Sequence, residues 1–431
     1  MTPTDRPGSS EHKTQASGQP TDAGAPRSGP LSGVRVIDLS AVLMGPYATQ
    51  ILADHGADVI KVESPGGGDS TRQIGPSHHP GMGPLFLNLN RGKRSIVLDL
   101  KQPAGLAAMH RLLAGADVFM HNLRPASIDG LGLGYEQVRA IRPGIVWCGM
   151  YGYGEGGPYA GRPAYDDLIQ GAVGIAELQA RASQGPPRYV PLVIADRMAG
   201  LHAVHSISMA LYAKEKTGRG CRIDVPMFET LASVVLGDHL YARTFEPAEG
   251  GSGYVRLLSP GRRPYATRDG HICALVYNDG QWRRFLQAIE REDLLADDRF
   301  AELSSRTRHI DHVYGFLAEV LAGRQTAEWL ALFERIDVPA MPLNCVDSLL
   351  DDPHIKAVEL LTRVEHPTEG TLQLPRVPVD WTDHRPGPIA PAPRLGEHTV
   401  SVLQECGFDR QEVEAFLRSG AAVGGAPTLI S

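Results

Sequence analysis

The feature that most constrains the fold is a series of short apolar segments that alternate with helical patterns from residue 33 onward. Continuous apolar strands separated by helices are typical of a parallel sheet that is covered on both faces. The pattern therefore predicts an α/β domain built on a parallel sheet. The predicted strands are residues 34–40, 58–64, 95–100, 117–122, 145–152 and, after a long helix, 222–227.

A change in composition indicates where this domain ends. Residues 244–264 are rich in Gly, Arg and Pro, which is typical of a boundary between domains. We predict a large domain over residues 31–243, a smaller α+β domain over 244–340, and a loop-rich C-terminal segment over 341–431. Residues 1–30 are rich in Ser, Thr, Gly and Pro, and predict a disordered tail without a signal-peptide core.

Charge and composition exclude several classes of protein. The net charge of -7 argues against nucleic-acid binding through the whole surface, although a local basic pocket for an anionic ligand stays possible. No apolar run approaches the roughly 18–20 residues that a membrane span needs. The five cysteines are far apart and form no CxxC pair. We therefore expect reduced thiols in a cytoplasmic protein, with neither a disulfide framework nor a metal site.

Motifs for common cofactors are missing or ambiguous. The first predicted strand is followed by neither GxGxxG nor a Walker A lysine, which excludes nicotinamide and P-loop chemistry. Glycines in residues 64–72 and basic residues in 88–101 suit a phosphate site, but a flexible turn and a solvated rim fit equally well. Asn122 and Arg124 follow the fourth predicted strand, at the edge where such sheets bind ligands.

Asp196 stands at the start of a predicted helix with a face of small residues, Ala199, Ala203, Ser206 and Ala210. Aspartate is among the best helix N-caps, and the helix dipole also favours negative charge there. Both effects predict a low pKa and an ionised carboxylate. The same position also suits an exposed nucleophile. From the residues alone the cap is favoured, and the nucleophile remains an alternative.

Several motifs occur together in a fixed order. They are LSGVRVIDLSAVLMGPYATQILADHGADVIKVESPGGGD, NRGKRSIVLDLK, DVFMHNLRP, IADRMAG with KTGRG, and LGEHT. In this order, over about residues 31–410, the chain resembles the class III CoA-transferases, which include formyl-CoA transferase and carnitine CoA-transferase. The resemblance implies a large Rossmann-like domain completed by the C-terminal segment, a small domain, and a homodimer of two interlocked ring-like chains.

The resemblance also implies a site and a reaction. Asp196 is implied as the catalytic nucleophile of an acyl-CoA:carboxylate CoA-transferase, which forms a covalent aspartyl intermediate. Coenzyme A is then a substrate, a small carboxylic acid is the partner, and neither a tightly bound cofactor nor a metal is needed. The implied CoA contacts are Leu43, Met44, Leu98, Lys101, Asn122, Leu123, Arg124, Tyr165 and Asp166.

Two other functions are weighed against this one. The α-methylacyl-CoA racemases of the same family need a histidine as a second base in the segment GRPAYDDLIQG. This chain has no histidine between His121 and His202, so the racemase interpretation is disfavoured. The presence of Asp196 counts against a non-catalytic CoA-binding relative.

The acid substrate is less constrained. The chain has Ser64 and Pro163 where formyl-CoA transferases have Arg and Lys, which weakens the expectation of oxalate specificity. Arg256, Arg262 and Arg263, near the predicted domain boundary, could bind a second carboxylate. That role would favour a dicarboxylate such as succinate, and solvated surface arginines are the equally plausible alternative.

Overall fold

The computed structural model describes residues 28–383 and 390–425, so the predicted tail at 1–30 lies almost entirely outside the described residues. A seven-stranded sheet is formed by β1 (Arg35–Leu39), β2 (Asp58–Glu63), β3 (Arg94–Leu98), β4 (Val118–His121), β5 (Val146–Tyr151), β6 (Cys221–Pro226) and β12 (Ala422–Val423). Its order is β12-β3-β2-β1-β4-β5-β6. Only β12 is antiparallel to its neighbour, so the predicted parallel sheet is confirmed.

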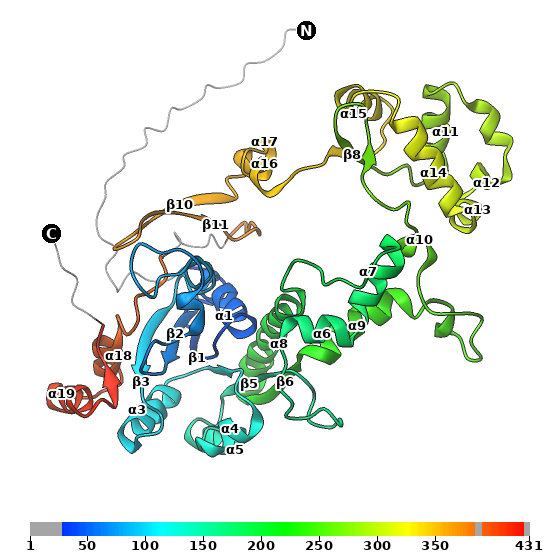
Figure 1. Cartoon of the computed structure of the whole chain (residues 1–431). Coiled ribbons are helices and arrows are strands. Elements are labelled where there is room, and N and C mark those ends of the chain that lie inside the picture. Colours follow the sequence, from blue (N-terminus) through cyan, green and yellow to red (C-terminus); the bar gives the residue numbers. More distant parts are fainter. Residues whose placement is uncertain (1–27, 384–389, 426–431) are drawn as a thin grey trace, which may run out of the picture.

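Helices cover both faces of this sheet (Figure 1). One buried cluster packs side chains of α1, α8 and α9 against the sheet, and the other packs α3, α5 and α18 against the opposite face. Burial on both faces explains why the strands are apolar throughout. The helices are α1 (Met44–Asp54), α2 (Pro84–Leu89), α3 (Pro103–Ala114), α4 (Pro125–Gly130), α5 (Tyr135–Ile141), α6 (Asp166–Ala172), α7 (Ile175–Ser183), α8 (Ile194–Thr217), α9 (Met227–His239) and α18 (Thr399–Glu405).

The small domain has its own core. Its antiparallel sheet contains β7 (Tyr265–Ala266), β8 (His271–Ala274) and β9 (Ala340–Pro342). Aromatic side chains, among them Trp282, Phe285, Trp329 and Phe333, fill the space between this sheet and the helices. The helices are α10 (Val255–Leu258), α11 (Asp279–Ala288), α12 (Asp298–Ala301), α13 (Leu303–Arg308), α14 (Ile310–Leu321) and α15 (Thr326–Arg335).

The C-terminal segment contains more regular structure than a loop-rich tail. It forms α16 (Val346–Leu350), α17 (Pro353–Ala357), the antiparallel pair β10 (Leu361–His366) and β11 (Gly370–Pro375), then α18, α19 (Arg410–Ser419) and β12. Two of the prolines that suggested loops stand at the ends of elements, since Pro353 opens α17 and Pro375 closes β11, whereas Pro378, Pro391 and Pro393 lie outside helices and strands. Proline is tolerated at such positions, so these two prolines mark the boundaries of elements.

The C-terminal segment also returns to the large domain. The LGEHT motif lies beside β3, where the N–H of His398 donates to the carbonyl of Ser95 at 2.9 Å. The Thr399 hydroxyl accepts from the N–H of Val97 at 3.1 Å and donates to the carbonyl of Val423 at 2.7 Å. The motif therefore attaches the last strand to the edge of the sheet.

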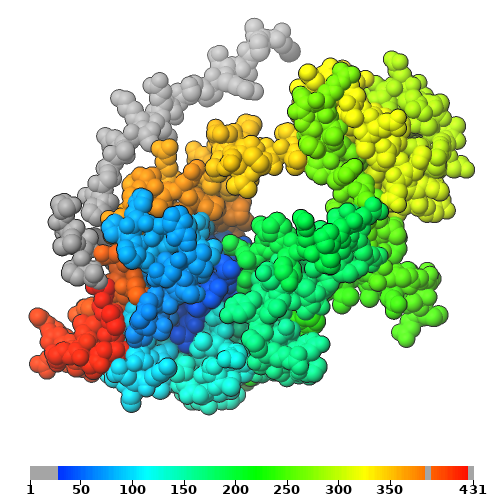
Figure 2. All heavy atoms as spheres, in the orientation of Figure 1, coloured from blue at the N-terminus to red at the C-terminus, as the bar shows by residue number. Residues whose placement is uncertain are grey.

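The chain as a whole encloses an opening. Figure 2 shows a gap bounded by the large domain, by the small domain and by the connection through α16 and α17. Such a shape agrees with the expectation of a ring-like chain. The interlocking of two copies stays a prediction.

Candidate active site

A cavity of about 380 Å³ lies at the carboxyl ends of β1, β4, β5 and β6. Strand order reverses between β1 and β4, and open α/β sheets bind ligands at such a switch point. Because several strands end there, segments distant in sequence meet at the cavity. Its lining residues are Ala41, Val42, Leu43, Met44, Asn122, Arg124, Pro125, Met150, Tyr151, Gly152, Tyr153, Gly161, Arg162, Pro163, Ala164, Tyr165, Asp196 and Met227.

The cavity brings together many of the residues singled out in the sequence. Leu43, Met44, Asn122, Arg124, Tyr165 and Asp196 all line it. The other expected CoA contacts lie elsewhere. Leu98 is buried in the core, Lys101 is exposed, Leu123 packs against the core, and Asp166 is buried beneath the start of α8.

Asp196 is the third residue of α8, not its N-cap. The helix begins at Ile194, and its N-cap is Val193, which supplies no side-chain hydrogen bond. The N–H groups of Ala195 and Asp196 donate to Oδ1 of Asp166 at 2.7 and 3.1 Å. The predicted capping role is therefore wrong, because a carboxylate from α6 satisfies these donors.

Asp166 is held in place by a glutamine one turn later in α6. Nε2 of Gln170 donates to Oδ2 of Asp166 at 2.6 Å, and Oε1 of Gln170 accepts from the N–H of Val190 at 2.9 Å. Gln170 also donates to the carbonyl of Leu192 at 3.1 Å. This network ties α6 to the segment that leads into α8 and so fixes the backbone at the start of α8 relative to α6.

The electrostatic environment of Asp196 differs from the expectation. Burial, reinforced by the nearby charge of Asp166, raises the pKa of Asp196 to about 7. The positive charge of Arg197 opposes this rise, but its guanidinium lies over the ring of Tyr47, 4.2 Å from the centroid. The predicted low pKa is therefore wrong, because burial and the like charge of Asp166 disfavour the ionised form more than Arg197 favours it.

Small residues let α8 lie close to α1. Ala199 and Ala203 are fully buried, as the predicted small-residue face requires. At Gly200, a Cβ atom would come within 2.8 Å of a Tyr47 ring carbon and 3.1 Å of the Met44 carbonyl oxygen. Any larger residue would push α1 away from α8. Since both helices begin at the cavity, this contact fixes two of its walls together.

Asn122 has a different role from a simple ligand contact. Its Oδ1 accepts from the N–H of Ala41 at 3.0 Å, and its Nδ2 donates to the carbonyl of Ala41 at 2.7 Å. The carboxamide therefore holds the connection between β1 and α1.

The basic residues near β3 serve the fold. Arg91 pairs with Asp54 at 2.7 Å, Lys93 with Asp38 at 3.0 Å, and Arg94 with Asp58 at 2.7 Å. None of these three lines the cavity. The phosphate site considered for residues 88–101 therefore does not form from them, because each cation neutralises an acid on a neighbouring element.

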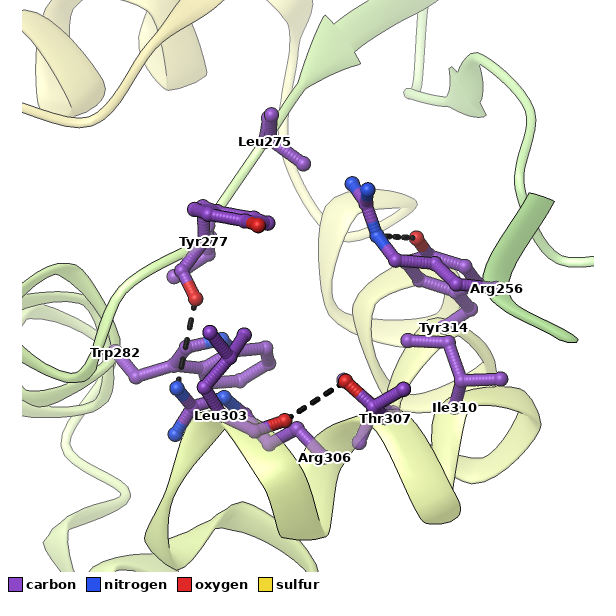
Figure 3. Close-up of a pocket in the computed structure, with 11 residues that line it drawn as sticks. Arg256, Leu275, Tyr277, Trp282, Leu303, Arg306, Thr307, Ile310 and Tyr314 are labelled. Atoms are coloured by element: carbon purple, nitrogen blue, oxygen red, sulfur yellow. Dashed lines mark hydrogen bonds between the residues drawn. The ribbon is translucent and has the colours of Figure 1, made fainter. Parts of the chain in front are cut away.

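A second, much smaller pocket lies in the small domain (Figure 3). Arg256 borders it, and Nε of Arg256 donates to the hydroxyl of Tyr314 at 3.1 Å. Its guanidinium also lies 5.2 Å from the centroid of the Tyr277 ring. No carboxylate of the described residues pairs with Arg256, whereas Arg262 and Arg263 are exposed at the surface.

Sequence reasoning missed part of the cavity wall. Met150, Tyr151 and Tyr153 at the end of β5, Arg162, and Met227 after β6 all line it. These residues could have been predicted from the sequence. Ligands of open α/β sheets bind at the carboxyl ends of the strands, and this favours residues that follow β5 and β6 as much as Asn122 after β4.

The described residues contain neither a cluster of metal ligands nor a disulfide. Within residues 28–383 and 390–425, no three His, Cys, Asp or Glu side chains gather closely enough to hold a metal ion. All five cysteines are free thiols. No helix in this part of the chain is long and apolar enough to cross a membrane.

Comparisons with known proteins agree with this architecture. The chain is 31% identical over 395 residues to human succinyl-CoA:glutarate CoA-transferase, covering 91% of this chain and 89% of the relative. It is 34% identical to a succinate–glutarate CoA-transferase of Agrobacterium fabrum, covering 88% of this chain and 96% of the relative. A crystal structure of a CaiB/BaiF family protein from Brucella suis superposes with a TM-score of 0.74 at 32% identity, covering 88% of this chain and 100% of that one.

The family model described as CoA-transferase family III matches residues 31–399. That range contains the cavity, the small domain and every strand of the large sheet apart from β12. The resemblance seen in the ordered motifs is thereby confirmed. The chain belongs to CoA-transferase family III and is an enzyme of the CoA-transferase type.

Proposed function

We propose that this chain moves CoA from a donor acyl-CoA to an acceptor carboxylic acid through a covalent intermediate on Asp196, with a dicarboxylate as one of the acids. The observation that carries the proposal is the placement of Asp196. Its side chain lines the cavity at the switch point of the sheet, and a separate carboxylate, Asp166, holds the start of its helix. The Asp196 carboxylate is thereby left available for attack.

The proposed reaction is a series of balanced acyl transfers. The Asp196 carboxylate attacks the thioester carbon of the donor, the C–S bond breaks, and an anhydride and CoA thiolate form. The thiolate attacks the aspartyl carbonyl and releases the donor acid, which leaves an aspartyl-CoA thioester. The acceptor carboxylate then attacks that thioester, and the same steps in reverse give the new acyl-CoA and free Asp196. No net proton, electron or water is consumed.

The remaining lining residues suit the binding of CoA. Arg124 and Arg162 line the cavity, and neither pairs with a carboxylate of the described residues, so their charges are free for the phosphates of CoA. Leu43, Met44 and Tyr165 offer apolar and aromatic surface. Pro163, where formyl-CoA transferases have lysine, also lines the cavity, which favours an acid other than oxalate.

The racemase alternative finds less support. Two-base proton transfer needs an acid or base on each side of the α-carbon. None of the side chains that line the cavity is a histidine. His121 is buried among aromatic rings outside the lining, and burial lowers its pKa to about 3, which keeps the imidazole neutral.

A dicarboxylate is favoured by the names of the relatives. Those reported above are called succinyl-CoA:glutarate and succinate–glutarate CoA-transferases, and a further one from Haloarcula hispanica, 33% identical, is called a succinyl-CoA:mesaconate CoA-transferase. We propose Arg256 as the residue that binds the distal carboxylate, because its guanidinium has an aromatic setting and no partner acid among the described residues.

We also propose a homodimer. The helix α7 buries none of its residues within a single chain, and α8 exposes Leu201, Met209 and Tyr212. Apolar surface of this kind is a common mark of a protein interface. A second copy that passes through the opening in Figure 2 would cover it.

The nucleophile is tested by replacing Asp196. Asp196→Ala should lower transfer by at least about 10³-fold, because the covalent route is lost, and should change CoA affinity by less than about threefold. Incubation of the native enzyme with acyl-CoA and hydroxylamine should yield a modified Asp196 peptide in a mass spectrum. Asp167→Ala, at the exposed neighbour of Asp166, is the control. Full activity of Asp196→Ala would exclude the assignment.

The raised pKa predicts a pH-dependent stability effect. An acid whose folded pKa lies above its unfolded value of 3.8 stabilises the fold at low pH, and that contribution is lost as the pH rises through about 7. Asp196→Asn removes this titration. The stability gained over the native enzyme should therefore be larger at pH 8 than at pH 5, by up to about 3 kcal/mol, and Tm should follow it. Equal gains at both pH values would contradict the raised pKa, and Asp167→Asn should give no such difference.

The role of Arg256 is tested with pairs of acids. Arg256→Ala should lower kcat/KM for succinate by about 10- to 100-fold, because a charge-assisted contact is lost, and should leave kcat/KM for butyrate nearly unchanged. The exposed Arg263→Ala is the matched control. An equal loss for both acids would assign Arg256 to the fold of the small domain rather than to recognition.

The homodimer is tested by sedimentation. The native enzyme should sediment at about twice the chain mass of 46.5 kDa. Met209→Glu places a charge on the exposed face of α8 and should shift the mass toward a single chain, whereas Gln137→Glu on exposed α5 should not. A native enzyme that sediments as one chain at micromolar concentration would refute the dimer.

A further inference from the structure

The connection between β1 and α1 has an unusual backbone conformation. Val42 has a φ of 73°, in the left-handed region that β-branched residues avoid. Such a conformation persists only where the surrounding structure stabilises it. Ala41, Val42, Leu43 and Met44 line the cavity that also contains Asp196. The conformation at Val42 therefore sets the shape of one wall of the candidate active site.

Asp69 is the side chain that stabilises this conformation. The N–H of Val42 donates to both carboxylate oxygens of Asp69 at 3.2 Å. Asp69 is itself fixed by Lys61, whose Nζ lies 2.9 Å from Oδ2, and both side chains are only 1% exposed. Lys61 also donates to the carbonyl of Ser40 at 2.8 Å. The buried pair thus holds the chain on both sides of Ala41, whose own peptide groups bond to Asn122.

We propose that Asp69 is a positioning residue for acyl-CoA binding, which holds Val42 in its left-handed conformation and so places Leu43 and Met44 in the cavity wall. This inference rests on the proposed function, since it requires CoA to enter this cavity. Asp69 does not line the cavity, so it acts through Val42.

A local role for Asp69 has to be separated from this one. Its Oδ1 also accepts from the N–H and hydroxyl of Thr71 at 2.9 and 2.8 Å, which caps the short 3₁₀ turn at Ser70–Gln73. If Asp69 served only that turn, its loss would have the same effect whatever residue stands at position 42. Glycine adopts a positive φ without steric cost, so in Val42→Gly the left-handed conformation at residue 42 no longer depends on Asp69.

The test is a double-mutant cycle read by CoA binding. Calorimetry with CoA measures Kd for the native enzyme, Asp69→Asn, Val42→Gly and the double variant. Asp69→Asn should raise Kd about tenfold in the native background, and less than about threefold in the chain that carries Val42→Gly. Hydrogen exchange at the Val42 amide, followed in a peptide over residues 40–47, should become faster in Asp69→Asn.

Controls keep each outcome decisive. Asp54→Asn breaks another buried pair, with Arg91, and should lower Tm while leaving Kd unchanged in both backgrounds. If Asp69→Asn does not fold, Asp69→Asn combined with Lys61→Met, which leaves no unpaired buried charge, replaces it in the cycle. Equal losses of affinity with and without Val42→Gly would overturn the positioning role. Failure of the native enzyme to bind CoA would instead refute the proposed function.

Discussion

The carboxylate of Asp166 is the interaction on which the candidate site depends. It accepts the N–H groups of Ala195 and Asp196, and so stabilises the first turn of α8 from outside that helix. Because Asp166 of α6 caps α8, the carboxylate of Asp196 is not needed to accept hydrogen bonds from the first turn of its own helix. The same arrangement places two acids close together in a buried setting, which raises the pKa of Asp196. Asp166 therefore fixes the start of α8 and also adds to the rise in the pKa of Asp196 that burial causes.

The sheet and the helices α1 and α8 place the start of α8 at the cavity. Strand order reverses between β1 and β4, so α1 and α8 both begin beside the same opening. Gly200 allows the two helices to approach closely, and a side chain there would contact Tyr47. The ring of Tyr47 in turn lies against the guanidinium of Arg197. Tyr47 of α1 therefore contacts both Gly200 and Arg197 of α8, and Arg197 is the cation that lowers the pKa of Asp196.

The sequence predicted what depends on local pattern and missed what depends on distant partners. Strands that are buried on both faces are apolar throughout, so the six main strands of the large domain were found within one or two residues. The basic residues near β3 were misjudged because their acids, such as Asp54 and Asp38, lie 37 and 55 positions away. Asp196 was misjudged as a cap because Asp166 lies 30 positions away. Its catalytic role was implied by resemblance to a family rather than by any local pattern.

A covalent route also suits the charges of this cavity. Direct exchange would require the acceptor carboxylate to approach the thioester while Asp196 and Asp166 are both negative nearby. In the proposed aspartyl-CoA thioester, Asp196 is esterified to sulfur and has no charge. The charge of Asp166 is meanwhile shared among donors from Ala195, Asp196 and Gln170. The intermediate therefore removes the nearest repulsion at the step where a second carboxylate must enter, and the released thiolate restores the Asp196 anion only after that acid has reacted.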